Sequence, residues 1–99
     1  MDIRKYEEDG KLVIAPKGRL DTASSPEMEQ VLDSVPAGTA HLILDFAGLD
    51  YISSAGLRLL LITHKRMIGT GGELTVRNVN ETIAGIFEVT GFAELLNVE

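Results

Sequence analysis

The sequence contains no cysteine and only two histidines, His41 and His64. The absence of cysteine excludes disulfides, thiolate nucleophiles and thiolate metal sites. A structural zinc site would have to rest almost entirely on carboxylates, which is uncommon. We therefore expect a protein that holds no metal ion.

Positive charge is scarce, and long apolar runs are missing. Fifteen Asp and Glu residues stand against nine scattered Lys and Arg residues, for a formal net charge of −6. A chain of this sign repels phosphate backbones and anionic headgroups, so we expect neither nucleic acid nor a membrane as a partner. An apolar run such as Leu59–Ile62 is far too short to span a bilayer, and residues 1–10 lack an apolar signal core. We expect a soluble, cytoplasmic protein.

The 99 residues, of which 44% are hydrophobic, suit a single domain over residues 1–99. Periodicity and turn residues predict a hairpin through a type I′ turn at Asp9-Gly10, and a helix capped by Ser24 or Ser25. A later helix is capped by Asn78 or Asn80, and one helical turn and a short strand follow it. The other predicted elements are strands at Ile3–Glu8, Leu12–Lys17, His41–Phe46 and Glu73–Arg77, a loop at Ala47–Ser53, and a helix at Leu57–Ile68.

The alternation of strands and helices predicts crossover connections and a mostly parallel sheet, to which the hairpin adds an antiparallel pair. The expected fold class is therefore α/β: a mixed sheet of four to five strands packed with three to four helices. The expected order is β-β-α-β-α-β-α, with a possible final strand.

Polar residues follow two of the predicted strands, where α/β proteins place their functional groups. One loop, Gly18–Ser25, contains Asp21 and Thr22, and the other, Asp45–Gly56, ends with Ser53 and Ser54. A serine at a helix start lies beside free amide groups and the positive end of the helix dipole, which accommodate a phosphate. A serine there is also a common N-cap. Two adjacent serines allow both roles, with Ser53 as the cap and Ser54 facing outward.

Enzymatic interpretations find little support. The chain lacks a Gly-x-Ser-x-Gly elbow, a phosphate-binding P-loop and a dinucleotide fingerprint. The histidine nearest to Ser54 in the sequence is His64, about 15 Å away along the predicted helix, which is too far for proton transfer. We expect a non-enzyme. A small hydrolase that uses Ser54 and a nucleotide-binding module are the rival interpretations, and ester turnover or tight nucleotide binding would support them.

The predicted helix after Ser54 is apolar nearly all round in its first half, from Leu57 to Ile62. A helix packed on one face of a sheet normally has a polar outer face. Either one apolar flank is accessible to a partner protein, or the helix is packed between two neighbours.

Three segments, in this order, resemble the STAS family and, within it, the bacterial anti-sigma factor antagonists. The first is Gly18-Arg19-Leu20-Asp21, which matches a Gly-x-Leu-Asp turn. The second, the most specific, runs from Leu44 to Leu57 and contains Tyr51-Ile52-Ser53-Ser54-Ala55-Gly56-Leu57. The third comprises Gly71-Gly72-Glu73-Leu74 and the Phe-x-x-x-Gly pattern of Phe87 to Gly91. The resemblance covers about Ile3 to Val98.

The resemblance implies a STAS-like single domain and a partner-switching function. In such antagonists a kinase phosphorylates the first hydroxyl of an Asp-Ser-Ser/Thr-Gly-Leu signature. Aligned on Gly56-Leu57, that residue is Ser54; Ser53 replaces the usual aspartate and becomes a second candidate. The implied partners are a serine kinase-type anti-sigma factor and a serine phosphatase. The implied partner-binding residues are Asp21, Thr22, Asp50, Tyr51, Ser53, Ser54, Ala55, Gly56 and Leu57. The alternative is an unphosphorylated STAS scaffold in a lipid-transport or stressosome-like complex.

Overall fold

The computed structural model describes all residues from 1 to 99. The elements, in chain order, are β1 (Asp2–Glu8), β2 (Lys11–Leu20), α1 (Ser25–Asp33), β3 (His41–Asp45), β4 (Leu49–Ile52), α2 (Ser54–Gly69), β5 (Glu73–Arg77), α3 (Glu81–Thr90), α4 (Phe92–Leu95) and β6 (Asn97–Val98). No helix is both long enough and apolar enough to cross a bilayer.

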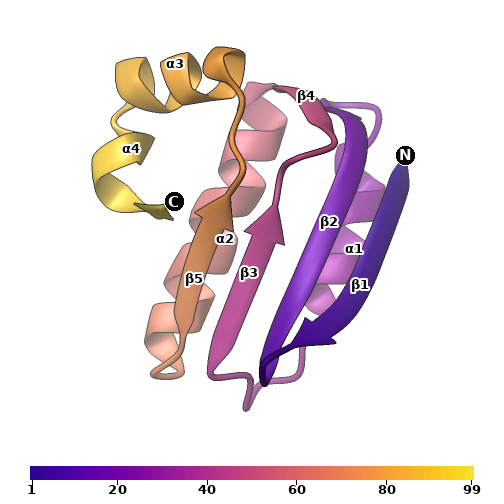
Figure 1. Cartoon of the computed structure of the whole chain (residues 1–99), viewed down its shortest axis with the longest axis vertical. Coiled ribbons are helices and arrows are strands. Elements are labelled where there is room, and N and C mark those ends of the chain that lie inside the picture. Colours follow the sequence, from indigo (N-terminus) through magenta and orange to yellow (C-terminus); the bar gives the residue numbers. More distant parts are fainter.

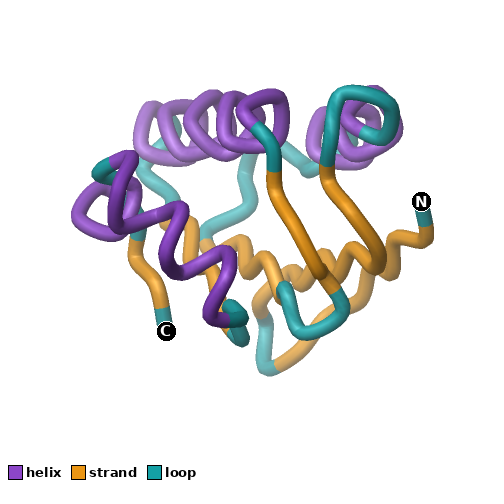
Figure 2. The backbone as a smooth tube through the Cα atoms, turned by 90° about the horizontal axis from the view of Figure 1, so that it is seen from above, coloured by secondary structure: helices purple, strands orange, loops and turns teal.

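The strands form one mixed sheet in the order β1-β2-β3-β5-β6, and β4 pairs with β2 outside this path. Only the β1–β2 pair is antiparallel. Helices α1 and α2 lie side by side on one face of the sheet, while α3 and α4 lie beyond β5 (Figures 1 and 2). The predicted mixed α/β architecture is confirmed, and the sheet has six strands because β4 joins the predicted ones.

The hairpin that opens the chain is built as predicted. Asp9 and Gly10 both have positive φ, 52° and 78°, as a type I′ turn requires. β1 is an edge strand, and its exposed residues are all charged: Asp2, Arg4, Lys5, Glu7 and Glu8. Charged side chains on an edge strand oppose pairing with a second chain.

β2 is longer than predicted, because it continues past Lys17 to Leu20. The pairing shifts register between Gly18 and Arg19, where Gly18 has a φ of 110°. Residues 12–14 of β2 pair with β3, and Gly18–Leu20, which span this bulge, pair in parallel with β4. The predicted loop Ala47–Ser53 is therefore wrong in its second half, since residues 49–52 form a strand. The sequence signal is weak, because only Leu49 and Ile52 of the four residues are buried.

The helix ends differ from the predictions in their side-chain bonds. Ser24 is the N-cap residue of α1, but its hydroxyl donates to the Arg19 carbonyl (2.7 Å) and makes no cap bond. Asn80 caps α3 by accepting from the Ile83 amide at 2.8 Å. Asn78, the other predicted cap, instead donates to Asp45.

The core lies between the sheet and the layer of α1 and α2. Alternate residues of the central strands face the helices, so Leu42 and Leu44 of β3 lie in this core while Asp45 lies on the opposite face. Met28 of α1 and Leu60 of α2 are fully buried against the strands. Packing of this kind fixes both helices relative to the sheet.

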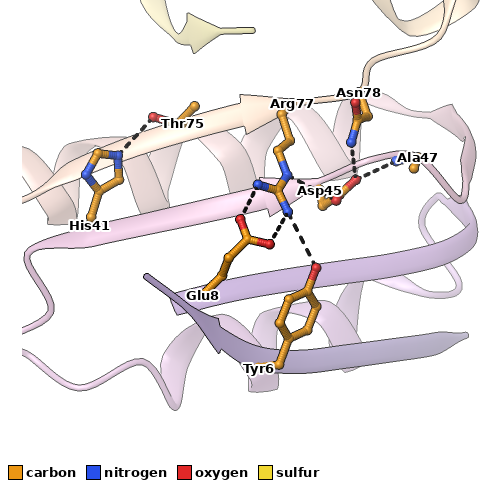
Figure 3. Close-up of polar contacts among 8 residues, drawn as sticks. All are labelled: Tyr6, Glu8, His41, Asp45, Ala47, Thr75, Arg77 and Asn78. Atoms are coloured by element: carbon orange, nitrogen blue, oxygen red, sulfur yellow. Dashed lines mark hydrogen bonds and ion pairs between the residues drawn. The ribbon is translucent and has the colours of Figure 1, made fainter. Parts of the chain in front are cut away.

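A polar network joins three strands on the open face of the sheet (Figure 3). The Arg77 guanidinium of β5 donates to Glu8 of β1 at 2.7 Å and to Asp45 of β3 at 3.1 Å. Asp45 also accepts from the Asn78 side chain and the Ala47 amide. Farther along the same face, His41 contacts the Thr75 hydroxyl at 3.2 Å.

The network changes the acidity of the carboxyl groups that it holds. Burial raises the pKa of Asp45, but hydrogen bonds from the Ala47 amide, Asn78 and Arg77 outweigh burial and place the pKa below its usual value. The hydrogen bond from Arg77 lowers the pKa of Glu8. A carboxyl whose folded pKa is depressed stabilises the fold above its unfolded pKa and loses that contribution as the pH falls through the folded pKa.

We predict that Asp45→Asn lowers the free energy of unfolding by about 1–2 kcal/mol at pH 7, since one charged acceptor is removed from a half-buried cluster. The difference from wild type should shrink as the pH falls below the ordinary pKa of an aspartate, because wild-type Asp45 becomes protonated in acid. Urea unfolding at several pH values measures both effects. Glu29→Gln on α1 is the control, because the Glu29 side chain makes no hydrogen bond or ion pair. A constant difference between pH 7 and pH 2 would contradict the assignment.

Candidate functional site

Ser54 is the first residue of α2, and the end of β2 determines where it lies. Leu20 pairs with Ile52 in the short parallel ladder, and the Ser53 amide donates to the Leu20 carbonyl at 2.9 Å. The side chains of Leu20 and Ile52 are both fully buried. The backbone that leads into Ser54 is therefore fixed by hydrogen bonds on one strand and by core packing beneath it.

Gly56 allows α2 to begin against this ladder. A Cβ atom at position 56 would lie 2.6 Å from Cγ1 of Ile52 and 2.8 Å from Cγ of Leu20. Both distances are shorter than real Cβ contacts allow. The first turn of the helix consequently lies directly on two buried side chains, and Leu57 beside it is also buried.

The two serines at this junction differ in accessibility. Ser54 is exposed, whereas the Ser53 hydroxyl oxygen is buried and has no hydrogen-bond partner. Ser53 occupies the N-cap position and its carbonyl accepts from the Leu57 amide, but its side chain makes no cap bond. The predicted side-chain cap at Ser53 is therefore wrong, because the hydroxyl turns into the protein. The outward orientation predicted for Ser54 agrees with its exposure.

The start of α2 is electropositive. The amides of residues 54–56 have no backbone or side-chain partner, and the first turn contains no acidic residue. Unpaired amides and the helix dipole favour a negative group at this end. Ser54 lies outside the three hollows of the molecular surface. The arrangement can thus carry an anionic group on an exposed hydroxyl that a second protein can reach.

The loop after β2 is held by its own side chains. The Asp21 carboxylate accepts from the Ala23 and Ser24 amides, both at 3.1 Å. The bonds from Ser24, followed by that from Ala23, hold the pKa of Asp21 below its usual value. Thr22 is exposed at the tip of this turn. Asp21 is therefore a half-buried anion that organises the loop, with Thr22 presented to solvent.

Arg19 was not among the predicted site residues. Its guanidinium lies 4.5 Å from the centroid of the Tyr51 ring and 3.9 Å from Asp21. Tyr51 is half-buried, and Asp50 before it is exposed. Arg19 thereby links the predicted residues of the β2 loop to those of β4. The contact depends on the register of β2 and β4, and this register follows only once β4 is recognised as a strand.

Asn80 holds β4 from the other side. Its amide nitrogen donates to the Leu49 carbonyl at 3.1 Å and to the Asp50 carbonyl at 3.3 Å, while its oxygen caps α3. The sequence suggested the cap but gave no signal for the two bonds to β4. Asn80 therefore connects the start of α3 to the strand that precedes Ser54.

The structure brings the predicted partner-binding residues to one junction of β2, β4 and α2, but with unequal exposure. Thr22, Asp50 and Ser54 are exposed; Asp21, Tyr51, Ser53 and Ala55 are half-buried; Gly56 and Leu57 are buried. The last two support the surface from below.

Catalytic alternatives gain no geometric support at Ser54. His64 lies ten residues farther along α2, which corresponds to about 15 Å. The His64 Nδ1 atom is buried without a partner. No three His, Asp and Glu side chains are grouped so that they could hold a metal ion.

Comparisons with known proteins identify the family of the chain and its fold. The model of the STAS domain matches residues 2–99. A Bordetella bronchiseptica protein named as an anti-sigma factor antagonist, BtrV, is 34% identical over 91 residues, covering 91% of this chain and 78% of that protein. An anti-sigma factor antagonist from Mycobacterium paratuberculosis has the same fold, with a TM-score of 0.89, 21% identity, and coverage of 98% of this chain and 83% of the other. Phosphorylated SpoIIAA from Bacillus also has this fold, with a TM-score of 0.75, 17% identity, and coverage of 99% and 91%.

We predict that Gly56→Ala lowers the free energy of unfolding by about 1–3 kcal/mol, because the added methyl group overpacks Leu20 and Ile52. Gly85→Ala is the matched control, since Gly85 lies within α3 with open space around it. That substitution should stabilise the protein by about 0.5–1 kcal/mol. Urea unfolding measures both variants. A Gly56→Ala protein as stable as wild type would show that the helix start is not packed as described.

Proposed function

Since the chain belongs to the STAS family, we propose that it is an anti-sigma factor antagonist that switches between partners according to the phosphorylation of Ser54. The single observation that carries this proposal is the contrast between two adjacent hydroxyls. Ser54 is exposed at an electropositive helix start, and the Ser53 oxygen is buried. Only the first is open to a kinase. Relatives named as anti-sigma factor antagonists support the assignment.

The proposed docking surface consists of the exposed and half-buried residues around Ser54. Thr22 and Asp50 form its outer part, and Asp21, Tyr51 and Ala55 complete it. Gly56 and Leu57 orient this surface and do not touch the partner, because both are buried. A surface fixed by core packing binds with little loss of conformational entropy.

The partner is a serine kinase-type anti-sigma factor. When Ser54 is unphosphorylated, the chain binds this anti-sigma factor. The anti-sigma factor then releases the sigma factor that it had bound. In the phosphorylation step the Ser54 oxygen attacks the γ-phosphorus of ATP, and the bond to the β-phosphate oxygen breaks to release ADP. The hydroxyl proton passes to a base on the kinase, since His64 is out of reach. A serine phosphatase restores the hydroxyl with water and releases inorganic phosphate.

Phosphorylation weakens docking through charge. A phosphoserine carries about −1.5 to −2 charges at neutral pH. Burying this dianion without a partner costs several kcal/mol, and about 4 kcal/mol corresponds to a thousandfold weaker complex. Asp21 and Asp50 belong to the same surface and add negative charge. Asp45 contributes less than its sequence position suggests, because Arg77 and Asn78 bind its carboxylate on the open face.

The remaining parts of the proposal follow from this switch. The chain is a regulator and not an enzyme, because ATP and magnesium belong to the kinase. It requires no cofactor of its own. It acts in the cytoplasm, where sigma factors and their regulators operate.

We predict that Ser54→Ala binds the kinase-type factor as wild type does but is not phosphorylated, and that Ser54→Asp binds at least tenfold more weakly. Ser53→Ala is the matched control, and it should be phosphorylated normally because it removes a buried hydroxyl without a partner. Incubation with the kinase and ATP, followed by phosphosite mapping and binding titrations, measures these effects.

Phosphate on Ser53 alone, or on neither serine, would contradict the proposal. Recovery of a transporter ATPase, and no kinase, in a pull-down would favour the alternative of a STAS scaffold in a lipid-transport complex.

A further inference from the structure

The outer face of α2 continues from Ser54 as a stripe of basic and apolar residues. At 3.6 residues per turn, six residues other than glycine fall within a sector about 120° wide. These are Ser54, Arg58, Leu61, Ile62, Lys65 and Ile68. Leu61 is half-buried, and the other five residues are exposed; Ile62 and Ile68 are 46% and 60% accessible. The opposite sector contains the buried residues of the helix, so the stripe points to solvent.

Positive charge is unusual on this chain, yet α2 carries Arg58, Lys65 and Arg66 and no acidic residue. Arg66 is occupied, because it bonds to the Leu32 carbonyl and lies 3.5 Å from Asp33. Arg58 has no ion pair and no hydrogen bond. It is therefore an uncommitted cation, and it lies one helical turn from Ser54.

We propose that Arg58 is the residue that reads the phosphorylation state of Ser54, an inference that rests on the function proposed above. In the unphosphorylated protein the Arg58 guanidinium binds a carboxylate on the anti-sigma factor. In the phosphorylated protein it binds the phosphate on Ser54 instead. Phosphorylation then acts twice, since it adds negative charge to the docking surface and withdraws the cation that the partner needs.

The spacing of the two residues supports this exchange. Residues at i and i+4 of a helix have Cβ atoms about 5–6 Å apart, within reach of a guanidinium and a phosphate. The order is also favourable, because an anion that precedes its cation agrees with the helix dipole. A guanidinium binds two phosphate oxygens at once, which makes the pair selective for the modified serine.

Arg19 is the rival cation near this junction, but it is already engaged. Its guanidinium lies over the Tyr51 ring and faces Asp21. Turning toward Ser54 would break both contacts. Lys65 is uncommitted but lies eleven residues from Ser54, about 16 Å along the helix. Arg58 is thus the cation best placed to bind the phosphate.

The test uses the full chain with phosphoserine incorporated genetically at position 54, so that no kinase is needed. Phosphorus NMR titration gives the second pKa of the phosphate, ordinarily about 6. A bound cation favours the dianion and lowers this pKa, so Arg58→Gln should raise it by about half a unit. Lys65→Gln is the matched control and should leave it unchanged. An unchanged value in Arg58→Gln, or a shift produced by Arg19→Gln instead, would overturn the inference.

Binding measurements complete the test. In the unphosphorylated chain Arg58→Gln should weaken binding to the anti-sigma factor by about three- to tenfold. In that unphosphorylated chain, Arg58→Lys should bind more tightly than Arg58→Gln, because it keeps the positive charge. In the phosphoserine chain Arg58→Gln should have little effect on binding. Equal losses in both forms would overturn the exchange.

If the kinase leaves Ser54 unmodified while Arg58→Gln still shifts the phosphate pKa, the proposed function fails and the ion pair stands. If Ser54 is modified and no shift occurs, only the role of Arg58 fails.

Discussion

The parallel pairing of the last three residues of β2 with β4 is the constraint on which the site depends. Leu20 contributes to it twice, through its carbonyl bond to the Ser53 amide and through its side chain under Gly56. Asn80 secures β4 from the opposite side. Ser54 is therefore exposed on a backbone that the core holds in place, and the phosphorylation proposed for it requires no change of fold.

The two faces of the sheet differ in chemistry and in structural role. The face under α1 and α2 is apolar and fixes the helices, while the open face is joined by Arg77 and its carboxylate partners (Figure 3). Asp45 belongs to the open face although it ends the strand that leads toward the serines. Its carboxylate binds the Arg77 guanidinium and thereby holds β3 to β5. The electrostatics near Ser54 consequently depend on Asp21, Asp50 and Arg58 of α2.

Much of this organisation follows from local sequence chemistry, and the remainder depends on tertiary contacts. The Asp9-Gly10 turn and the order of elements are determined by backbone preferences and periodicity, so they could be predicted. β4 could not, because a four-residue strand is identified by its partner more than by its own residues. The orientation of Ser53 and the two hydrogen bonds from Asn80 to β4 could not be predicted for the same reason: each depends on contacts that exist only after folding.

The borders of the sheet determine how this molecule meets others. β1 has a fully charged exposed row, and β6 at the other border is only two residues long. Neither offers an attractive template for strand addition, so recognition cannot rely on main-chain ladders, which few single substitutions disturb. Contacts must instead be made by individual side chains on helices and loops. A complex held by side-chain contacts can be dissociated by modifying a single side chain, whereas a complex held by a continuous ladder of main-chain hydrogen bonds would resist such a change.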